Sequence, residues 1–187
     1  SLTVRVTRAT RSVCSIPVMK ILLPFMMKRS PLRSAKVARA PKAAIFCSGD
    51  EVIPPSEPLR PGYVWDANSY TLSAQIEEYG GLPLFCGIMK DDFSAFKEAL
   101  KDGLSKADMV VISGGTAIGG GEFIADLIHS FGGPGVVVNG VPMRSGKPLI
   151  MGVIENKPVV CVAGYPPESL RGFELFGRPV IKRLLGI

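Results

Sequence analysis

The sequence predicts an α/β fold, a three-layer α/β/α sandwich with a mostly parallel sheet and helices on both faces. Three observations support this prediction. Short apolar runs alternate along the chain with segments whose apolar residues recur at helical spacing. The apolar runs lack alternating polar positions, which is typical of strands buried on both faces. The chain has 187 residues, 47% of them hydrophobic, so it is long enough to bury a sizeable core.

The first predicted strand covers Ala43–Cys47 (AAIFC) and ends at the polar turn Ser48-Gly49-Asp50. Prolines at four positions exclude regular structure from there to about Gly62. We then expect a helix over Ser69–Tyr79, because Asn68 is a favourable capping residue and a pair of glycines follows Tyr79.

The second predicted strand covers Leu82–Ile88 (LPLFCGI). The acidic pair Asp91-Asp92 then opens a helix, since carboxylates suit the positive end of the helix dipole. The remaining predicted elements are a strand over Met109–Ile112, a helix over Phe123–Ser130, strands over Val136–Val138 and Val159–Val162, and a last helix over Glu168–Leu185.

The net charge of +6 is unevenly distributed. Residues 1–42 hold ten Lys or Arg and no acid, whereas residues 43–187 hold twelve basic and sixteen acidic residues. We therefore divide the chain into a basic leader, or remnant of a neighbouring domain, over residues 1–42 and one domain over residues 43–187. An organelle transit peptide and a polyanion-binding arm are the alternatives for the leader. Because the domain is mildly acidic, we expect no nucleic-acid partner.

Several classes of protein are excluded by composition. No apolar stretch reaches the ~20 residues that span a bilayer, so we expect no membrane partner and a cytoplasmic location. Four scattered cysteines do not form a disulfide framework. With no C-x-x-C motif and with His129 as the single histidine, a structural zinc site is not expected.

In parallel sheets, ligands bind beyond the carboxyl ends of the strands, so the residues after each strand are candidate site residues. The turn Ser113-Gly114-Gly115-Thr116 follows a strand, and Gly119-Gly120-Gly121 leads into a helix. Glycines let backbone N–H groups approach an anion, and the helix start adds its dipole. The turn therefore suits a phosphate or a similar oxyanion, with a plain glycine-rich turn as the alternative.

Charged residues mark two further turns. Arg144 and Lys147 lie in a turn flanked by glycine and proline, where two cations would clamp an anion unless both are simply solvated. Asp50 directly follows the first strand. A carboxylate there would hold Mg²⁺, orient water or bind a hydroxyl, and the alternative is a turn residue that bonds its own backbone.

Five motifs in this order resemble the molybdopterin-binding domain of the molybdopterin molybdotransferase family, which includes MoeA and the E domain of gephyrin. They are Ser48–Ile53 (SGDEVI), Val64–Ser69 (VWDANS), Ser113–Thr116 (SGGT), Arg144–Pro148 (RSGKP) and Gly164–Pro166 (GYP). The resemblance covers roughly residues 42–187. It implies the MogA-like three-layer fold and a place in molybdenum cofactor biosynthesis.

The resemblance also implies a reaction and its ligands. Domains of this family bind adenylylated molybdopterin, and molybdate is inserted into the dithiolene while the adenylate is cleaved as AMP, with Mg²⁺ assisting. The residues that would bind the pterin and its phosphate are Ser113, Gly114, Gly115, Thr116, Arg144, Lys147, Gly164 and Pro166. Asp50 would be the essential carboxylate near the metal, and Glu122 stands where the family has a catalytic aspartate.

The chain departs from the family pattern at several positions, including Glu122, Ser145 in place of a proline, and the additional acid Glu168. An enzyme and a binding module that holds molybdopterin without turnover therefore both remain as interpretations. A third is a nucleotide pyrophosphatase of the CinA type, against which the Gly-Lys-Pro loop argues. Related domains form trimers alone and dimers within longer proteins, so we expect a homo-oligomer whose small-molecule partner is a pterin.

Overall fold

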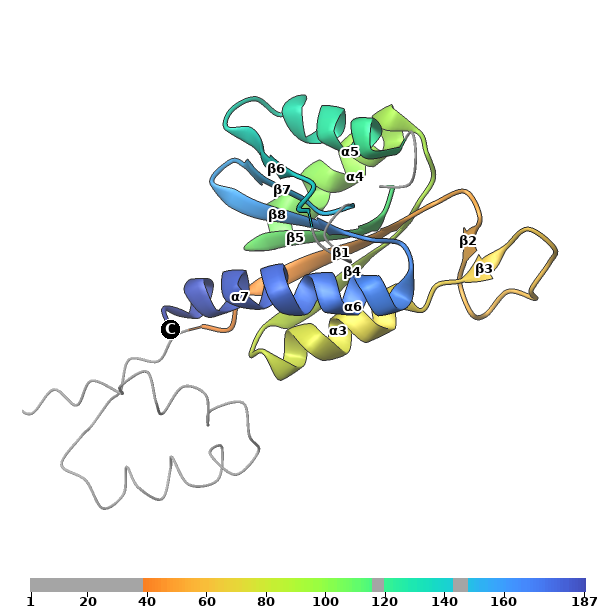
Figure 1. Ribbon diagram of the computed structural model, residues 1–187, viewed down its shortest axis with the longest axis horizontal. Coiled ribbons are helices and arrows are strands. Elements are labelled where there is room, and N and C mark those ends of the chain that lie inside the picture. Colours follow the sequence, from red (N-terminus) through yellow and green to blue (C-terminus); the bar gives the residue numbers. More distant parts are fainter. Residues whose placement is uncertain (1–38, 116–119, 143–147) are drawn as a thin grey trace, which may run out of the picture.

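The computed structural model describes residues 39–115, 120–142 and 148–187. The predictions for the leader before residue 39 and for Thr116, Arg144 and Lys147 lie outside these residues. Within them, six strands form one sheet in the order β4-β1-β5-β8-β7-β6 (Figure 1). The strands are β1 (Lys42–Ser48), β4 (Leu82–Met89), β5 (Met109–Gly114), β6 (Gly135–Asn139), β7 (Ile150–Ile154) and β8 (Lys157–Val162).

The sheet is mostly parallel, which confirms the predicted fold class. β1, β4, β5 and β8 pair in parallel, whereas β7 runs antiparallel to both β8 and β6. Two very short strands, β2 (Val52–Ile53) and β3 (Val64–Trp65), pair in parallel outside the main sheet. They project from the end of the molecule at which the parallel strands finish (Figure 1).

Helices cover both faces of the sheet (Figure 1). On one face lie α4 (Phe93–Lys106) and α5 (Gly120–His129), and on the other lie α3 (Asn68–Glu78), α6 (Pro166–Gly172) and α7 (Arg178–Leu185). Alternate residues of one strand serve the two faces, because successive side chains of a strand point in opposite directions. Phe46 packs with α4, with its ring centroid 5.8 Å from that of Phe96, whereas Ile45 belongs to the core on the α3 side.

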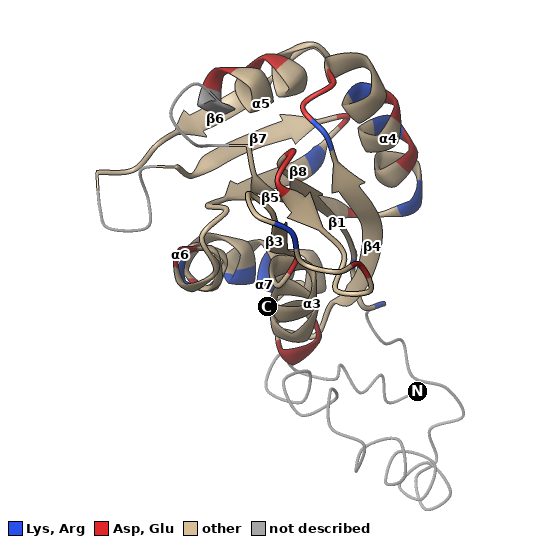
Figure 2. Ribbon diagram, turned by 90° about the vertical axis from the view of Figure 1, so that its right-hand side faces the viewer, with Lys and Arg blue, Asp and Glu red and all other residues tan. Residues whose placement is uncertain are grey.

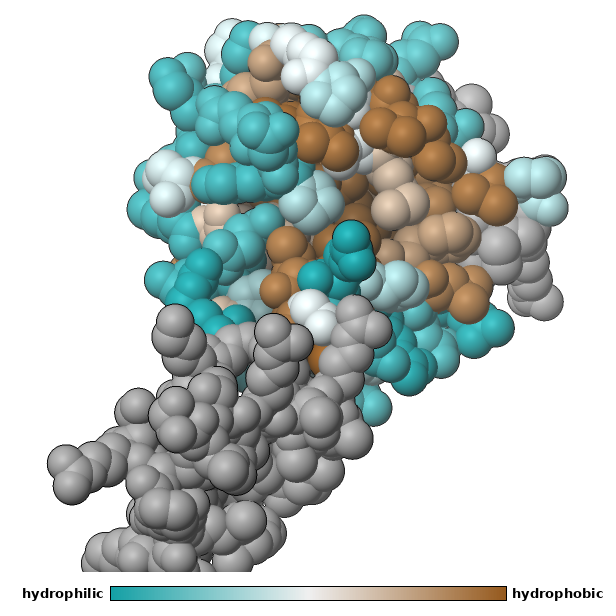
Figure 3. All heavy atoms as spheres, turned by 90° about the vertical axis from the view of Figure 1, so that its left-hand side faces the viewer, coloured by the Kyte–Doolittle hydropathy of each residue, from teal (hydrophilic) through white to brown (hydrophobic). Residues whose placement is uncertain are grey.

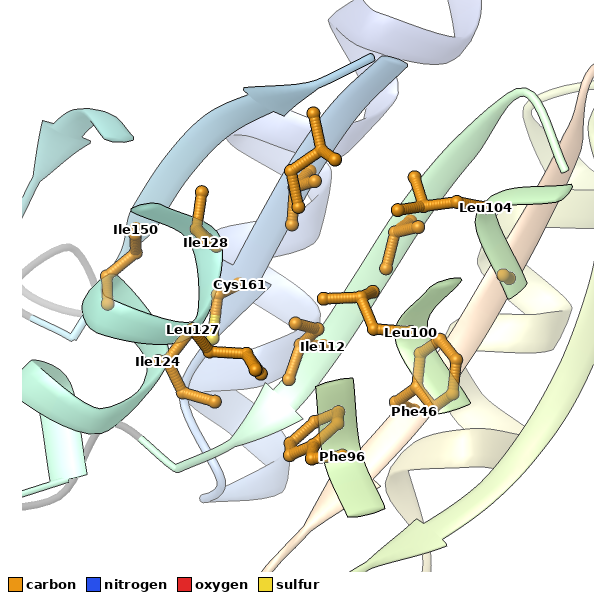
Figure 4. Packing of buried hydrophobic residues seen from close by; sticks show 14 of the residues in the cluster. Phe46, Phe96, Leu100, Leu104, Ile112, Ile124, Leu127, Ile128, Ile150 and Cys161 are labelled. Atoms are coloured by element: carbon orange, nitrogen blue, oxygen red, sulfur yellow. The ribbon is translucent and has the colours of Figure 1, made fainter. Parts of the chain in front are cut away.

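The core beneath α4 and α5 is apolar and closely packed (Figure 4). Leu100 and Leu104 of α4 meet Ile112 of β5, and Ile124 of α5 closes the cluster from the other side. Burial of each such side chain contributes on the order of 1.5–3 kcal/mol. The sheet is therefore a rigid platform from which the turns at its carboxyl end project.

Three strands and the last helix differ from the sequence prediction. The expectation of no regular structure up to about Gly62 is wrong at β2, which pairs with the equally unpredicted β3. The sequence analysis assigned no strand to β7, which forms a hairpin with β8 through Glu155 and Asn156, both with positive φ. The last helix begins at Pro166 instead of Glu168, and a π-helical turn (Phe173–Gly177) separates α6 from α7. A Cβ on Gly177 would lie 2.2 Å from the Phe173 ring, so glycine permits this packing.

The helix starts are partly as predicted. Asp92 caps α4, since its carboxylate accepts a hydrogen bond from the backbone N–H of Ala95 at 2.8 Å. The predicted capping role of Asn68 is wrong, because α3 begins at Asn68 itself and the carboxylate of Asp66 accepts from the N–H of Ser69 at 3.0 Å. No helix in the described part of the chain combines the length and the apolar character needed to cross a bilayer.

Candidate functional site

A cavity of about 790 Å³ lies where the parallel strands end. The ends of β1, β5 and β8 form its base, and β2, β3 and the start of α3 form one side. The same end of the molecule faces the viewer in Figure 2, where acidic residues mark the loop that leads into α4. The opposite end presents hydrophilic and hydrophobic side chains side by side (Figure 3). The location agrees with the rule that ligands bind beyond the carboxyl ends of parallel strands.

The base of the cavity is built from glycine. Gly114 and Gly115 have φ values of +92° and +65°, a region that L side chains rarely adopt. A Cβ on Gly114 would lie 2.3 Å from the carbonyl oxygen of Ser48, and one on Gly115 would lie 2.9 Å from Ile124. The turn after β5 therefore passes so close to β1 and α5 that only glycine fits. Both glycines also line the cavity, so this tightly packed turn forms part of its surface.

A buried polar network joins three sides of the cavity. The side-chain amide of Asn68, at the start of α3, donates to Ser113 Oγ and to the carbonyl oxygen of Gly164, both at 2.7 Å. Ser113 in turn donates to the carbonyl oxygen of Ala163 at 3.2 Å. Asn68 thus links the ends of β5 and β8 instead of capping its helix. Its Oδ1 is buried and has no hydrogen-bond partner within residues 39–115, 120–142 and 148–187.

Asp66 and Cys47 meet on the wall of the same cavity. The Cys47 thiol donates to Asp66 Oδ1 at 3.2 Å, the same oxygen that accepts from the backbone N–H of Ser69 in the first turn of α3. Burial raises the pKa of the Cys47 thiol, and the negative charge of Asp66 raises this pKa further. The thiol therefore stays protonated at neutral pH and acts as a hydrogen-bond donor, not as a nucleophile.

Carboxylates form one edge of the cavity. Glu51 and Asp91 line it, and Asp91 Oδ1 accepts a hydrogen bond of 3.4 Å from Ser48 Oγ. Asp50 is exposed and does not belong to the lining, although its Oδ1 accepts from the backbone N–H of Asp91 at 3.3 Å. Sequence reasoning missed Asp91 as a site residue. The signal was present, because Asp91 follows β4 as Asp50 follows β1.

The predicted site residues fall into three groups. Ser113, Gly114, Gly115, Gly164 and Pro166 come together around the cavity, although the last two are about fifty positions away in the sequence. Asp50 and Glu122 are exposed and lie outside the described lining. Thr116, Arg144 and Lys147 are outside the described residues.

The described residues contain no group of three or more His, Cys, Asp or Glu side chains arranged to hold a metal ion by themselves. A cation at the acidic edge would therefore need further ligands from water or from the bound molecule. Mg²⁺ is commonly held in this way, by one or two carboxylates together with substrate phosphates. Glu51 and Asp91 both line the cavity, and their carboxylates are of the ligand type that Mg²⁺ prefers.

Comparisons with known proteins identify the family to which the chain belongs. A family model described as a probable molybdopterin binding domain matches residues 44–183. The chain is 33% identical over 165 residues to the molybdopterin molybdenumtransferase of Nostoc sp., covering 87% of this chain and 38% of that protein. It is 30% identical over 152 residues to the enzyme of the same name from Bacillus subtilis, covering 81% of this chain and 35% of that protein.

Among solved structures, the molybdopterin biosynthesis MoeA protein from Pyrococcus horikosii superposes with a TM-score of 0.77 at 35% identity. The superposition covers 89% of this chain and 41% of that protein. The chain thus spans less than half the length of these three relatives.

Proposed function

Because this chain belongs to the family of probable molybdopterin binding domains, we propose that it binds adenylylated molybdopterin in the cavity and takes part in molybdate insertion with release of AMP. The observation that carries the proposal is the cavity of about 790 Å³ over the glycine-only turn after β5. Small-molecule sites commonly enclose about 300–1,000 Å³, so the space suits a pterin with its phosphate groups.

Ser113, Gly114 and Gly115 are proposed to hold the phosphate of the pterin, with Gly164 and Pro166 on a neighbouring wall. Their support is position, since all five line one cavity. For Thr116, Arg144 and Lys147 the support is the sequence motif. Cations from that motif would offset the negative charge of the phosphate groups and of molybdate.

We propose Mg²⁺ at the acidic edge, held by Glu51 and Asp91 with Asp50 beside them. The support is chemical: an anionic substrate next to carboxylates is repelled unless a cation lies between them. When bound, Mg²⁺ would neutralise charge on the phosphate oxygens as the adenylate leaves. The chain's own contribution is to orient Asp91 through the Ser48 hydroxyl and to keep the base of the cavity rigid through Asn68.

The exposure of Glu122 favours a second candidate function. This residue stands where the family has a catalytic aspartate, yet it lies outside the described lining of the cavity. Catalytic groups need placement to within a fraction of an ångström, so a displaced carboxylate costs much of the rate. A module that binds and delivers molybdopterin without turnover is therefore the alternative.

The test incubates the chain with adenylylated molybdopterin, molybdate and Mg²⁺, and quantifies AMP by liquid chromatography. Release by the wild-type chain well above that of Glu122→Ala and Asp50→Ala supports the enzyme. Binding measured by equilibrium dialysis without any AMP release supports the binding module. Absence of both binding and AMP release contradicts both candidates.

We also propose that the chain works as a homo-oligomer. The edge strand β4 carries Leu82 and Phe85 with about half of each side chain exposed, and apolar side chains at a sheet edge favour association. Light scattering coupled to size-exclusion chromatography measures the mass of the particle. A monomer at all accessible concentrations would contradict this proposal.

A further inference from the structure

We propose that Trp65 and Tyr165 form an aromatic mouth to the cavity, where a flat heteroaromatic ring of the ligand stacks. This inference rests on the proposed function, because it assigns the part of the same cavity that holds a ring of adenylylated molybdopterin. Both side chains line the cavity, yet Trp65 is 49% and Tyr165 66% exposed. Neither ring packs against another aromatic side chain of the described residues.

Trp65 is held in one orientation. Its indole N–H donates to the carbonyl oxygen of Glu57 at 2.9 Å, and its neighbour Asp66 donates a backbone N–H to Ile53 at 2.8 Å. Because the indole N–H already has its partner, the ring offers a ligand its apolar face and not its polar edge. A ring that is already fixed loses little conformational entropy when a ligand stacks on it.

Tyr165 lies in the turn before α6, and hydrogen bonds fix the backbone of this turn. Its carbonyl oxygen accepts hydrogen bonds from the backbone N–H groups of Glu168 and Ser169 at 3.0 and 2.9 Å, which fixes the start of α6. The hydrogen bond from Asn68 to the carbonyl oxygen of Gly164 joins this turn to the segment that carries Trp65. Two aromatic side chains from distant parts of the sequence are therefore held on one frame.

The lining near the two aromatic rings includes apolar side chains. Val52 and Val64, from the paired strands β2 and β3, and Pro166, which follows Tyr165, all line the cavity, as do the acids Glu51 and Asp66. Among the described lining residues there is no Lys or Arg, so a ring at the mouth would be recognised by stacking and apolar contact. The pterin and the adenine of adenylylated molybdopterin share this chemistry, since both are flat heteroaromatic rings.

Trp65 is the only tryptophan of the 187 residues, so tryptophan emission of the full chain reports on this ring alone. We expect saturable quenching by adenylylated molybdopterin and none by inorganic phosphate, after correction against free N-acetyltryptophanamide. Titrations with AMP and with neopterin assign the ring: quenching by AMP supports stacking of adenine, and quenching by neopterin supports stacking of the pterin. Binding of adenylylated molybdopterin without quenching would overturn the inference.

Affinity for adenylylated molybdopterin, measured by equilibrium dialysis, provides an independent readout. Trp65→Ala and Tyr165→Ala should each weaken binding about tenfold, the scale of a lost base–aromatic stack. Trp65→Phe keeps a ring and should bind more tightly than Trp65→Ala. The matched control is Tyr70→Ala, since Tyr70 is 64% exposed on α3 but does not line the cavity.

The outcomes separate this inference from the proposed function. Unchanged affinity in both Trp65→Ala and Tyr165→Ala would overturn the aromatic mouth and leave the binding function standing. A wild-type chain that does not bind adenylylated molybdopterin would overturn both. Thermal unfolding of each variant is measured as well, because Trp65 is half-buried and its indole N–H donates to Glu57. Weaker binding by a variant that unfolds at the wild-type temperature supports the stacking role, whereas weaker binding found only together with a lowered unfolding temperature would contradict it.

Discussion

Gly114 lets the turn after β5 pack against β1 because it has no Cβ atom. We expect Gly114→Ala to lower the free energy of unfolding by more than about 2 kcal/mol, because the new methyl group collides with the backbone of β1. Urea denaturation measures the change. Gly62→Ala is the matched control, since Gly62 has φ +83° but no atom within 4 Å of an added Cβ, and should cost about 1 kcal/mol. Equal losses in the two variants would contradict the steric argument.

Asn68 connects the same turn to the end of β8. Asn68→Ala should lower the free energy of unfolding by about 1–3 kcal/mol, because Ser113 and the Gly164 carbonyl lose a donor inside the protein. It should also weaken the binding of adenylylated molybdopterin, since Ser113 at the end of β5 and Gly164 after β8 lose the hydrogen bonds that join them to α3. Asn139→Ala, at an exposed position of β6, serves as the control. Unchanged stability of Asn68→Ala would show that the network is dispensable.

Among the elements, the segment between α4 and β5 is tied to the beginning of β1 by one carboxylate. Asp108 accepts hydrogen bonds from Arg39 Nη2 at 2.6 Å and from the backbone N–H of Lys42 at 2.8 Å. Partial burial alone would raise the pKa of Asp108, but the hydrogen bonds from Arg39 and Lys42 outweigh it and lower the pKa. The lowered pKa means that Asp108 stabilises the fold above about pH 4 and that this contribution disappears as the pH falls through the lowered value.

Asp108→Asn tests this pH dependence. At pH 7 the variant should be less stable than the wild type by up to about 1 kcal/mol, because the ion pair is partly exposed. The difference should vanish in strong acid, where the wild-type carboxyl is protonated as well. Urea denaturation across the acid range measures it, with Asp126→Asn at an exposed position as the control for charge loss. A difference that persists at the lowest pH would contradict the assignment.

β7 is a strand that the local sequence pattern does not predict. Its sequence IMGVI has alternating burial and a central Gly152, on which a Cβ would lie 2.8 Å from the carbonyl oxygen of Gly135. Glycine disfavours strands locally, so propensity argues against this one. Pairing with β6 and β8 overrides that preference.

For the whole molecule, a ligand that binds only the folded chain should raise its thermal stability. At a concentration a hundred times its Kd, adenylylated molybdopterin with Mg²⁺ should add about 2.7 kcal/mol. Asp91→Asn should keep the fold and lose the part of this gain that depends on Mg²⁺, whereas Asp102→Asn, on the exposed surface of α4, should keep it. Differential scanning fluorimetry with and without Mg²⁺ measures the gain. Identical gains in the wild type in both conditions would argue against a Mg²⁺ site.

The alternation of strands and helices could be inferred from residue order, because apolar periodicity is a local property that each segment carries into the fold. The end of the sheet at which we expect ligands followed from the same reasoning, and it brought Ser113 and Gly164 into consideration although 51 positions separate them. Three features depend on the tertiary structure. Asn68 donates a hydrogen bond to Gly164, 96 positions away. Asp91 lines the cavity whereas Asp50 does not, and Trp65 and Tyr165 line the same cavity. Such contacts depend on how separate segments pack in space, and no periodicity within one segment encodes them.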